Sequence, residues 1–169
     1  MEDITLEKHK LYVMIGTPGS GKSYIAAKKM ADVNIISRDQ IRFSKITDKD
    51  TYFEKENEVW DEYIKQIKES LKNNSATVAD ATHLNTRSRA KLFRALGSSL
   101  KGISLIAYYI KTPVETCIER NAQREGLAFV PISAIRRMAS QIEEPIAEEG
   151  WDAIITYDGK TYTFEEIKN

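Results

Sequence analysis

The feature that most constrains the fold is the segment 16–23, which reads Gly-Thr-Pro-Gly-Ser-Gly-Lys-Ser and matches the P-loop pattern G-x-x-x-x-G-K-[ST]. It follows the apolar run Leu11–Ile15 and precedes a helical pattern that extends to about Ala31. Glycines let the backbone N–H groups of such a loop converge on phosphate oxygens, and the helix adds its positive dipole end. Lys22 is expected to reach the β- and γ-phosphates of ATP, and the Ser23 hydroxyl to ligate Mg²⁺. The residues predicted to contact phosphate are Gly16, Thr17, Pro18, Gly19, Ser20, Gly21, Lys22 and Ser23.

Apolar strand-like runs alternate with helical segments along the chain, which is typical of an α/β domain with a mainly parallel sheet. This pattern predicts a P-loop NTPase fold with three α/β/α layers, a four- or five-stranded parallel sheet and one domain over residues 1–169. The further strands are expected at 33–36, 76–79, 103–110 and 153–157. Helices are expected at 49–72, 86–96 and 130–141, with another from Pro113 through Arg120 and Arg124, and the tail 158–169 as a turn, a short strand and a frayed helix.

Composition excludes several classes of protein. The 169 residues are 41% hydrophobic and 30% charged, and no apolar run is long enough to span a bilayer. The acidic N-terminus lacks the pattern of a signal peptide, and the single cysteine, Cys117, favours a cytoplasmic location. A net charge of zero argues against a protein that coats long nucleic acids, but it is compatible with an enzyme that binds a few phosphates.

Two aspartates follow predicted strands, at the sheet edge where parallel α/β proteins bind their ligands. Asp39 lies in Ser-Arg-Asp-Gln-Ile-Arg after the second strand, and Asp80 in Val-Ala-Asp-Ala-Thr after the third. A kinase that acts on an alcohol needs a carboxylate to accept the proton of the hydroxyl, and a polar group to help place Mg²⁺. By position alone either aspartate fits either role, and a helix N-cap is the structural alternative for both.

Basic residues near these aspartates suggest phosphate contacts. Arg42 lies three residues after Asp39, so one helical turn would place both on the same side. His83 and Arg87 follow Asp80 and are expected to line a groove for the acceptor.

A second basic pair marks a predicted lid over the nucleotide, at about residues 120–142. Arg120 and Arg124 have i, i+4 spacing and are expected to share one helix face. Gly126 and Pro131 bracket a segment that could move. An arginine above the transferring phosphate would stabilise its charge, whereas a solvated helix face is the alternative.

Taken together, these segments resemble the bacteriophage-type polynucleotide 5′-hydroxyl kinases. The resemblance extends from residue 11 to about residue 140, and the spaced set is more specific than the P-loop alone. The matching segments are 16–23, 37–42 (Ser-Arg-Asp-Gln-Ile-Arg), 80–85 (Asp-Ala-Thr-His-Leu-Asn), 120–124 (Arg-Asn-Ala-Gln-Arg) and 130–131 (Val-Pro).

The resemblance implies an adenylate-kinase-like fold with a helical lid, ATP and Mg²⁺ as cofactors, and the 5′-hydroxyl end of DNA or RNA as the substrate. It implies that Asp39 is the general base on the 5′-hydroxyl and that Arg42 holds the neighbouring 3′-phosphate. It also implies that Asp80 orients the groups that bind phosphate and magnesium, and that Arg124 contacts the donor phosphates.

The chain departs from that family because it has no segment matching a phosphatase domain, so we expect phosphorylation without trimming of 3′ ends. Kinases of this type also act on other hydroxyl groups, such as hydroxymethylated bases in phage DNA or small metabolites. A nucleotide-dependent switch protein is a further alternative, although it would leave Asp39 and Arg42 without a task.

Overall fold

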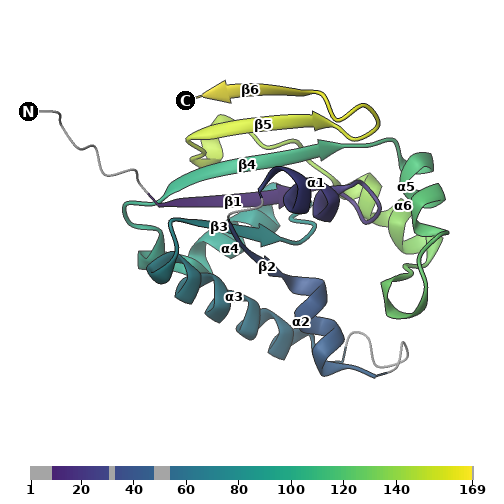
Figure 1. Cartoon of the computed structure of the whole chain (residues 1–169), viewed down its shortest axis with the longest axis horizontal. Helices are drawn as coiled ribbons and strands as arrows, with labels where there is room; N and C mark the ends of the chain where they lie inside the picture. Colours follow the sequence, from purple (N-terminus) through teal and green to yellow (C-terminus); the bar gives the residue numbers. More distant parts are fainter. Residues whose placement is uncertain (1–8, 31–32, 48–53, 169) are drawn as a thin grey trace, which may run out of the picture.

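The sheet of the computed structural model, which describes residues 9–30, 33–47 and 54–168, has the strand order β2-β3-β1-β4-β5-β6 (Figure 1). The first five of these strands run parallel, whereas β6 pairs antiparallel with β5. The parallel α/β fold predicted from the sequence is therefore confirmed. The strands are β1 (Lys10–Ile15), β2 (Asn34–Ser37), β3 (Ala76–Asp80), β4 (Ser104–Lys111), β5 (Ala153–Asp158) and β6 (Phe164–Lys168).

Helices cover both faces of the sheet, and α5 and α6 lie beyond the carboxyl ends of the parallel strands (Figure 1). No helix in the described part of the chain combines the length and the apolar character needed to cross a membrane. The helices are α1 (Lys22–Lys29), α2 (Arg38–Lys45), α3 (Glu56–Asn73), α4 (Thr86–Leu96), α5 (Val114–Asn121) and α6 (Ile132–Gln141), with short 3-10 turns η2 (Gly97–Leu100), η3 (Gly126–Ala128) and η4 (Ala147–Glu149).

Strand β1 lies at the centre because its side chains serve both faces of the sheet. Leu11, Val13 and Ile15 are fully buried in the larger core cluster, which includes residues of α3 and α4. Met14 points to the opposite face, where it packs with Ile25 of α1. This alternation holds the end of β1, and with it the start of the P-loop, between two cores.

Several predicted boundaries differ from the structure. Helix α3 is described only from Glu56, and the predicted start at Lys49 lies outside the described residues. The segment that carries Asp39 forms a separate helix, α2, whose N-cap Ser37 accepts a hydrogen bond from the Gln40 amide at 3.2 Å. The frayed helix predicted for the tail is wrong, because Phe164–Lys168 extends the sheet as β6 instead.

Helix α4 matches its predicted range, Thr86–Leu96, because its start is encoded locally. The Asn85 side chain accepts a hydrogen bond from the Ser88 amide at 2.8 Å, and the Ser88 hydroxyl accepts one from the Asn85 amide at 3.2 Å. This reciprocal cap fixes the loop between β3 and α4, which borders the P-loop.

Candidate active site

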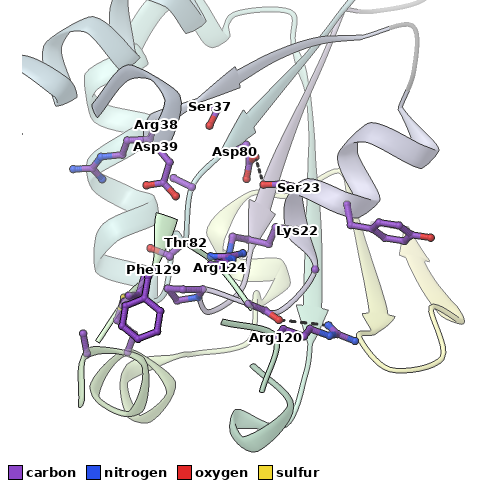
Figure 2. Close-up of a pocket in the computed structure, with 18 of the residues that line it drawn as sticks. Lys22, Ser23, Ser37, Arg38, Asp39, Asp80, Thr82, Arg120, Arg124 and Phe129 are labelled. Carbon is purple, nitrogen blue, oxygen red and sulfur yellow. Dashed lines mark hydrogen bonds between the residues drawn. The ribbon is translucent and has the colours of Figure 1, made fainter. Parts of the chain in front are cut away.

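A cavity of about 740 Å³ opens at the carboxyl ends of the parallel strands (Figure 2). It joins residues from the P-loop, α2, the end of β3, α6 and the tail. Its charged lining consists of five arginines, Lys22 and two aspartates, so positive charge dominates. The lining residues are Pro18, Gly19, Gly21, Lys22, Ser23, Tyr24, Ser37, Arg38, Asp39, Arg42, Asp80, Ala81, Thr82, Arg120, Arg124, Phe129, Val130, Pro131, Ser133, Ala134, Arg137, Met138 and Tyr162.

The P-loop conformation depends on two of its glycines. Gly19 and Gly21 have φ angles of +81° and +105°, a region that L side chains rarely adopt. At Gly19 a Cβ atom would also lie 2.5 Å from the carbonyl oxygen of Cys117, so the loop packs directly against α5. Thr17 and Ser20 are buried beside them, and the Thr17 hydroxyl lies 3.2 Å from the Cys117 Sγ.

We call Lys22, Ser23 and Asp80, together with the loop 16–23, the P-loop side of the cavity. The Lys22 ammonium donates a hydrogen bond to the Thr17 carbonyl at 2.8 Å. The Ser23 hydroxyl donates one to Asp80 Oδ2 at 2.9 Å (Figure 2). Burial lowers the pKa of Lys22, although the charges of Asp80 and Asp39 oppose this shift. Burial likewise raises the pKa of Asp80, against the effects of Lys22 and Ser23.

The Ser23 and Asp80 oxygens form a donor set that fits Mg²⁺. This ion prefers one or two carboxylate or hydroxyl ligands and takes its remaining ligands from phosphates and water. No cluster of three or more His, Cys, Asp or Glu side chains suited to a metal ion occurs among the described residues. Two protein oxygens would leave most coordination positions of the ion to phosphate and water.

We call Arg38, Asp39 and Arg42 the α2 side of the cavity. Arg42 is buried, and its Nη1 donates to Asp39 Oδ1 at 2.5 Å while its Nε donates to Glu56 Oε1 at 2.5 Å. The Nη2 atoms of Arg38 and Arg42 both donate to Glu56 Oε2 at 3.1 Å. Glu56 thus joins the two arginines of α2 to the first turn of α3. Burial would raise the pKa of Glu56, but its hydrogen bonds and ion pairs with the arginines lower that pKa below its usual value.

Asp39 differs from Asp80 in its surroundings. The side chain of Asp39 is 59% exposed at the cavity, whereas Asp80 is buried. Asp39 thus has room for a partner from solvent, and Asp80 is committed to the P-loop. The two aspartates, which the sequence did not tell apart, therefore differ in exposure and in hydrogen-bond partners.

Arg120 and Arg124 both line the cavity, but the prediction that they share a helix face is wrong. Helix α5 ends at Asn121, and Arg124 lies in the following loop. Arg120 donates through Nη1 to the Ser20 carbonyl at 3.1 Å and through Nη2 to the Gly159 carbonyl at 2.6 Å. Arg120 therefore links the backbone of the P-loop to the turn that follows β5.

The loop that carries Arg124 is closed by Asn121. The buried Asn121 amide donates to the Val130 carbonyl at 2.7 Å and accepts from the Val130 amide at 2.9 Å. Both ends of the segment 122–129 are held by this pair. Arg124 thus faces the cavity from a short, tethered loop.

His83 and Arg87 do not line the cavity, contrary to the groove predicted for them. The His83 ring is buried, with Nδ1 2.6 Å from the Met14 carbonyl and Nε2 3.1 Å from the Tyr63 hydroxyl. Burial lowers its pKa to about 4, so the ring is neutral at neutral pH, donates to Met14 and accepts from Tyr63. Arg87 is exposed on α4.

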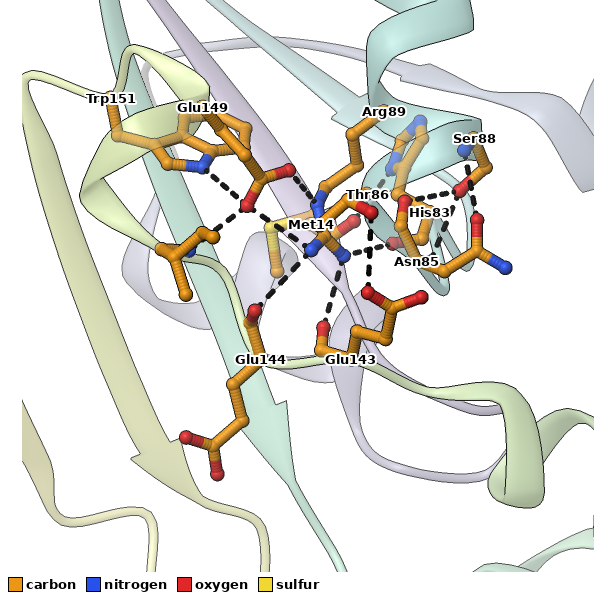
Figure 3. A network of polar contacts seen from close by, with 11 residues as sticks. Met14, His83, Asn85, Thr86, Ser88, Arg89, Glu143, Glu144, Glu149 and Trp151 are labelled. Atoms are coloured by element: carbon orange, nitrogen blue, oxygen red, sulfur yellow. Dashed lines mark hydrogen bonds and ion pairs between the residues drawn. The ribbon is translucent and has the colours of Figure 1, made fainter.

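A buried arginine that the sequence analysis did not single out supports the loop that contains His83 (Figure 3). Arg89 is fully buried, and its Nε donates to Glu149 Oε1 at 2.7 Å. Its Nη1 donates to the carbonyls of His83 and Glu143, at 2.9 and 3.1 Å. Arg89 thereby joins α4 to the segment that follows α6. Its ion-pair partner, Glu149, lies 60 residues away in the sequence, so no local pattern predicts the pair.

Further residues line the cavity without having been predicted as site residues, among them Arg38, Phe129, Met138 and Tyr162. Arg38 adjoins Asp39, but neighbouring helix positions point about 100° apart, so adjacency in the sequence did not predict that both line one cavity. Tyr162 has a φ angle of 58° and lies against Gly21 and Arg120, a contact made by the tail. Arg137 lines the cavity, while its neighbour Arg136 pairs with Glu115 at 2.9 Å.

A family model described as an AAA domain matches residues 11–145 of the chain. A comparison with curated proteins gave no match.

Solved structures share the fold. A chain of the Pnkp1/Rnl/Hen1 RNA repair complex has a TM-score of 0.63 and 22% identity over 83% of this chain and 46% of that one, so this chain spans less than half its length. A sugar kinase from Janibacter sp. HTCC2649 has a TM-score of 0.60 and 19% identity over 91% of this chain and 87% of that one. A gluconokinase from Sinorhizobium meliloti 1021 has a TM-score of 0.55 and 19% identity over 92% and 85%. At these identities the likeness establishes the fold alone.

Proposed function

Because this chain belongs to the AAA domain family and has the fold of the P-loop kinases, we propose that it transfers the γ-phosphate of ATP to the 5′-hydroxyl of a DNA or RNA strand. One observation carries the proposal. Five arginines and Lys22 line a single cavity that also contains an exposed carboxylate, Asp39. Such a cavity suits a reaction with phosphate on both partners, the donor nucleotide and an acceptor whose hydroxyl lies near its own phosphate.

The proposed roles follow the two sides of the cavity. On the P-loop side, the loop amides and Lys22 would hold the β- and γ-phosphates, and Ser23 and Asp80 would hold Mg²⁺. When bound, Mg²⁺ supplies positive charge that offsets the charge on the phosphates. Arg124 lines the same cavity, where burial and the Arg124 charge both lower the pKa of Lys22. Arg124 would stabilise the charge of the transferring group.

On the α2 side, Asp39 orients the 5′-hydroxyl and accepts its proton while the hydroxyl oxygen bonds to the γ-phosphorus and ADP leaves. The Nη1 atom of Arg42 lies 2.5 Å from Asp39 Oδ1, which supports the proposal that Arg42 holds the 3′-phosphate of the same nucleotide. Because Asp39 and Glu56 already pair with Arg42, the phosphate would compete with these two carboxylates for the guanidinium group.

The experiment that tests this proposal is transfer of label from γ-labelled ATP to a short oligonucleotide with a free 5′-hydroxyl. The matched control is the same oligonucleotide with a 5′-phosphate, which has no acceptor group at that end. We expect label on the first oligonucleotide and none on the second. Equal labelling of the two, or labelling of neither while another alcohol is labelled, would refute the proposed acceptor.

A second candidate, a sugar or related small polyol as the acceptor, has one observation in its favour. Glu56 and Asp39 neutralise Arg38 and Arg42 on the α2 side, so an uncharged acceptor could bind without displacing a carboxylate. The fold is also that of the sugar kinase and the gluconokinase above. Acceptors with and without phosphate, compared in one assay, separate the two candidates.

A further inference from the structure

Helix α4 presents a basic face outside the cavity. Arg87, Lys91 and Arg94 lie within an arc of about 60° around the helix axis, because the helix turns by about 100° per residue. All three side chains are exposed, and no carboxylate of the described residues lies within ion-pair distance of any of them. The chain as a whole has zero net charge, so this excess of positive charge is local.

This face is connected to the cavity through Trp60 of α3. The Lys91 Nζ lies 4.5 Å from the centre of the Trp60 ring, and the Arg38 Cζ lies 5.2 Å from it. Arg38 itself lines the cavity. A continuous row of contacts thus leads from the α2 side of the cavity, across an indole ring, to the outer face of α4. We call Arg38, Trp60, Lys91, Arg87 and Arg94 the basic stripe.

Two features of the stripe are not explained by folding. The Arg38 Nε is buried and has no hydrogen-bond partner among the described residues, which is costly unless a ligand supplies one. Two cations also flank one indole, although like charges repel each other. An alternation of aromatic ring and cations is the surface chemistry that binds single-stranded nucleic acid, whose bases stack and whose phosphates pair with cations.

We propose that the basic stripe binds the acceptor strand beyond its terminal nucleotide, with downstream phosphates on Lys91, Arg87 and Arg94 and a base or sugar edge near Trp60. This inference rests on the proposed function, because it places the rest of a strand whose 5′ end reacts at Asp39. The occupant is a single strand, since it must pass from a cavity onto one helix face. A small polyol acceptor would never reach α4.

The test compares a nucleoside 3′-phosphate with an oligonucleotide of roughly ten nucleotides, a typical length for a single-strand site. The variants are Lys91→Glu and Arg94→Glu, and the matched control is Lys101→Glu, an exposed lysine beyond the end of α4. We expect kcat/KM for the long acceptor to fall roughly tenfold more than for the short one in each stripe variant. Lys101→Glu should change kcat/KM by the same factor for the long and the short acceptor.

A binding measurement supplies a readout besides activity. Trp151 is buried, so quenching of tryptophan fluorescence by an added oligonucleotide reports on Trp60, and Trp60→Phe should remove it. The slope of log affinity against log salt should become shallower by about 0.7 for each stripe cation reversed, if each contacts one phosphate of a single strand.

If both stripe variants keep the full preference for the longer acceptor, the stripe does not bind the strand. The kinase proposal would still stand. The same conclusion would follow if the unmodified protein phosphorylated 5′-hydroxyl ends with no preference for acceptor length. If no oligonucleotide is phosphorylated and none quenches Trp60, the proposed function fails and the stripe fails with it.

Discussion

The P-loop side and the α2 side of the cavity are held in place by different forces. The P-loop is fixed through its own backbone: Gly19 packs against the Cys117 carbonyl, and the Ser20 carbonyl accepts hydrogen bonds from the side chains of Thr112 and Arg120. The α2 side is fixed by side-chain charges, with Glu56 joining Arg38 and Arg42. A loop held through its backbone should keep its shape when a charge that faces the cavity, such as that of Lys22, is removed. A charge-built site should change its chemistry, its salt dependence and its choice of acceptor.

The largest expected effect falls on the α2 side. Asp39→Asn removes the proton acceptor and should lower kcat by about 10²- to 10⁴-fold, the usual contribution of general base catalysis. Nucleotide binding, measured by fluorescence or calorimetry, should stay near that of the unmodified protein because Asp39 is not on the P-loop side. A variant with near-normal turnover would contradict the role of Asp39 as the base.

The next effect falls on the P-loop side. Lys22→Met should lower kcat by about 10²- to 10³-fold, because it removes a preorganised charge aimed at the transferring phosphate. The loss should be the same for every acceptor, since the proposal assigns Lys22 to the donor alone. Steady-state kinetics with two acceptors checks this, and a loss that depended on the acceptor would contradict the separation into two sides.

His83 contacts the Met14 carbonyl near the end of β1, just before the P-loop, and its effect should be seen in stability and not in catalysis. Its pKa is depressed to about 4 by burial, so the unfolded chain binds a proton below about pH 6.5 that the folded chain refuses. Stability from this residue is present above pH 6.5 and is lost as pH falls toward 4, by about 3 kcal/mol in total.

The variant for this test is His83→Asn, because asparagine tolerates the positive φ angle of 42° and can still donate to Met14. Urea unfolding at pH 7 and pH 4 should show a smaller loss of unfolding free energy in the variant than in the unmodified protein. Equal losses would show that His83 is not the group that titrates.

The smallest expected effect sharpens the account of the α2 side. Arg42→Ala should lower kcat/KM roughly tenfold more for an acceptor with a 3′-phosphate than for one without, since a hydrogen bond to a charged group contributes about 1.5–3 kcal/mol. Nucleotide affinity should change little. Equal losses for the two acceptors would mean that Arg42 only positions Asp39.

Local signals in the sequence were sufficient for much of the fold and part of the site. The P-loop sits where its glycines predict, and α4 begins at its Asn85 cap. Arg124 was misplaced because the helix that carries Arg120 ends at Asn121, whose side chain bonds to Val130 instead of continuing the helical pattern.

Partners that come together only on folding could not be predicted. Glu56 lies 14 residues from Arg42 and on another helix, and the predicted boundary of that helix did not distinguish it from its acidic neighbours. Arg89 reads as one more charge on α4, yet it is fully buried against Glu149. In both cases the burial of a charge, which sequence patterns do not report, decides the role.

The most direct test of the central claim is one assay of the unmodified protein with γ-labelled ATP and three acceptors. These are a nucleoside 3′-phosphate with a free 5′-hydroxyl, the same nucleoside without the phosphate, and a sugar. The two-sided cavity predicts the highest kcat/KM for the nucleoside 3′-phosphate and label on its 5′-oxygen. A higher kcat/KM for the sugar would contradict the claim that the α2 side is built for a nucleic-acid end.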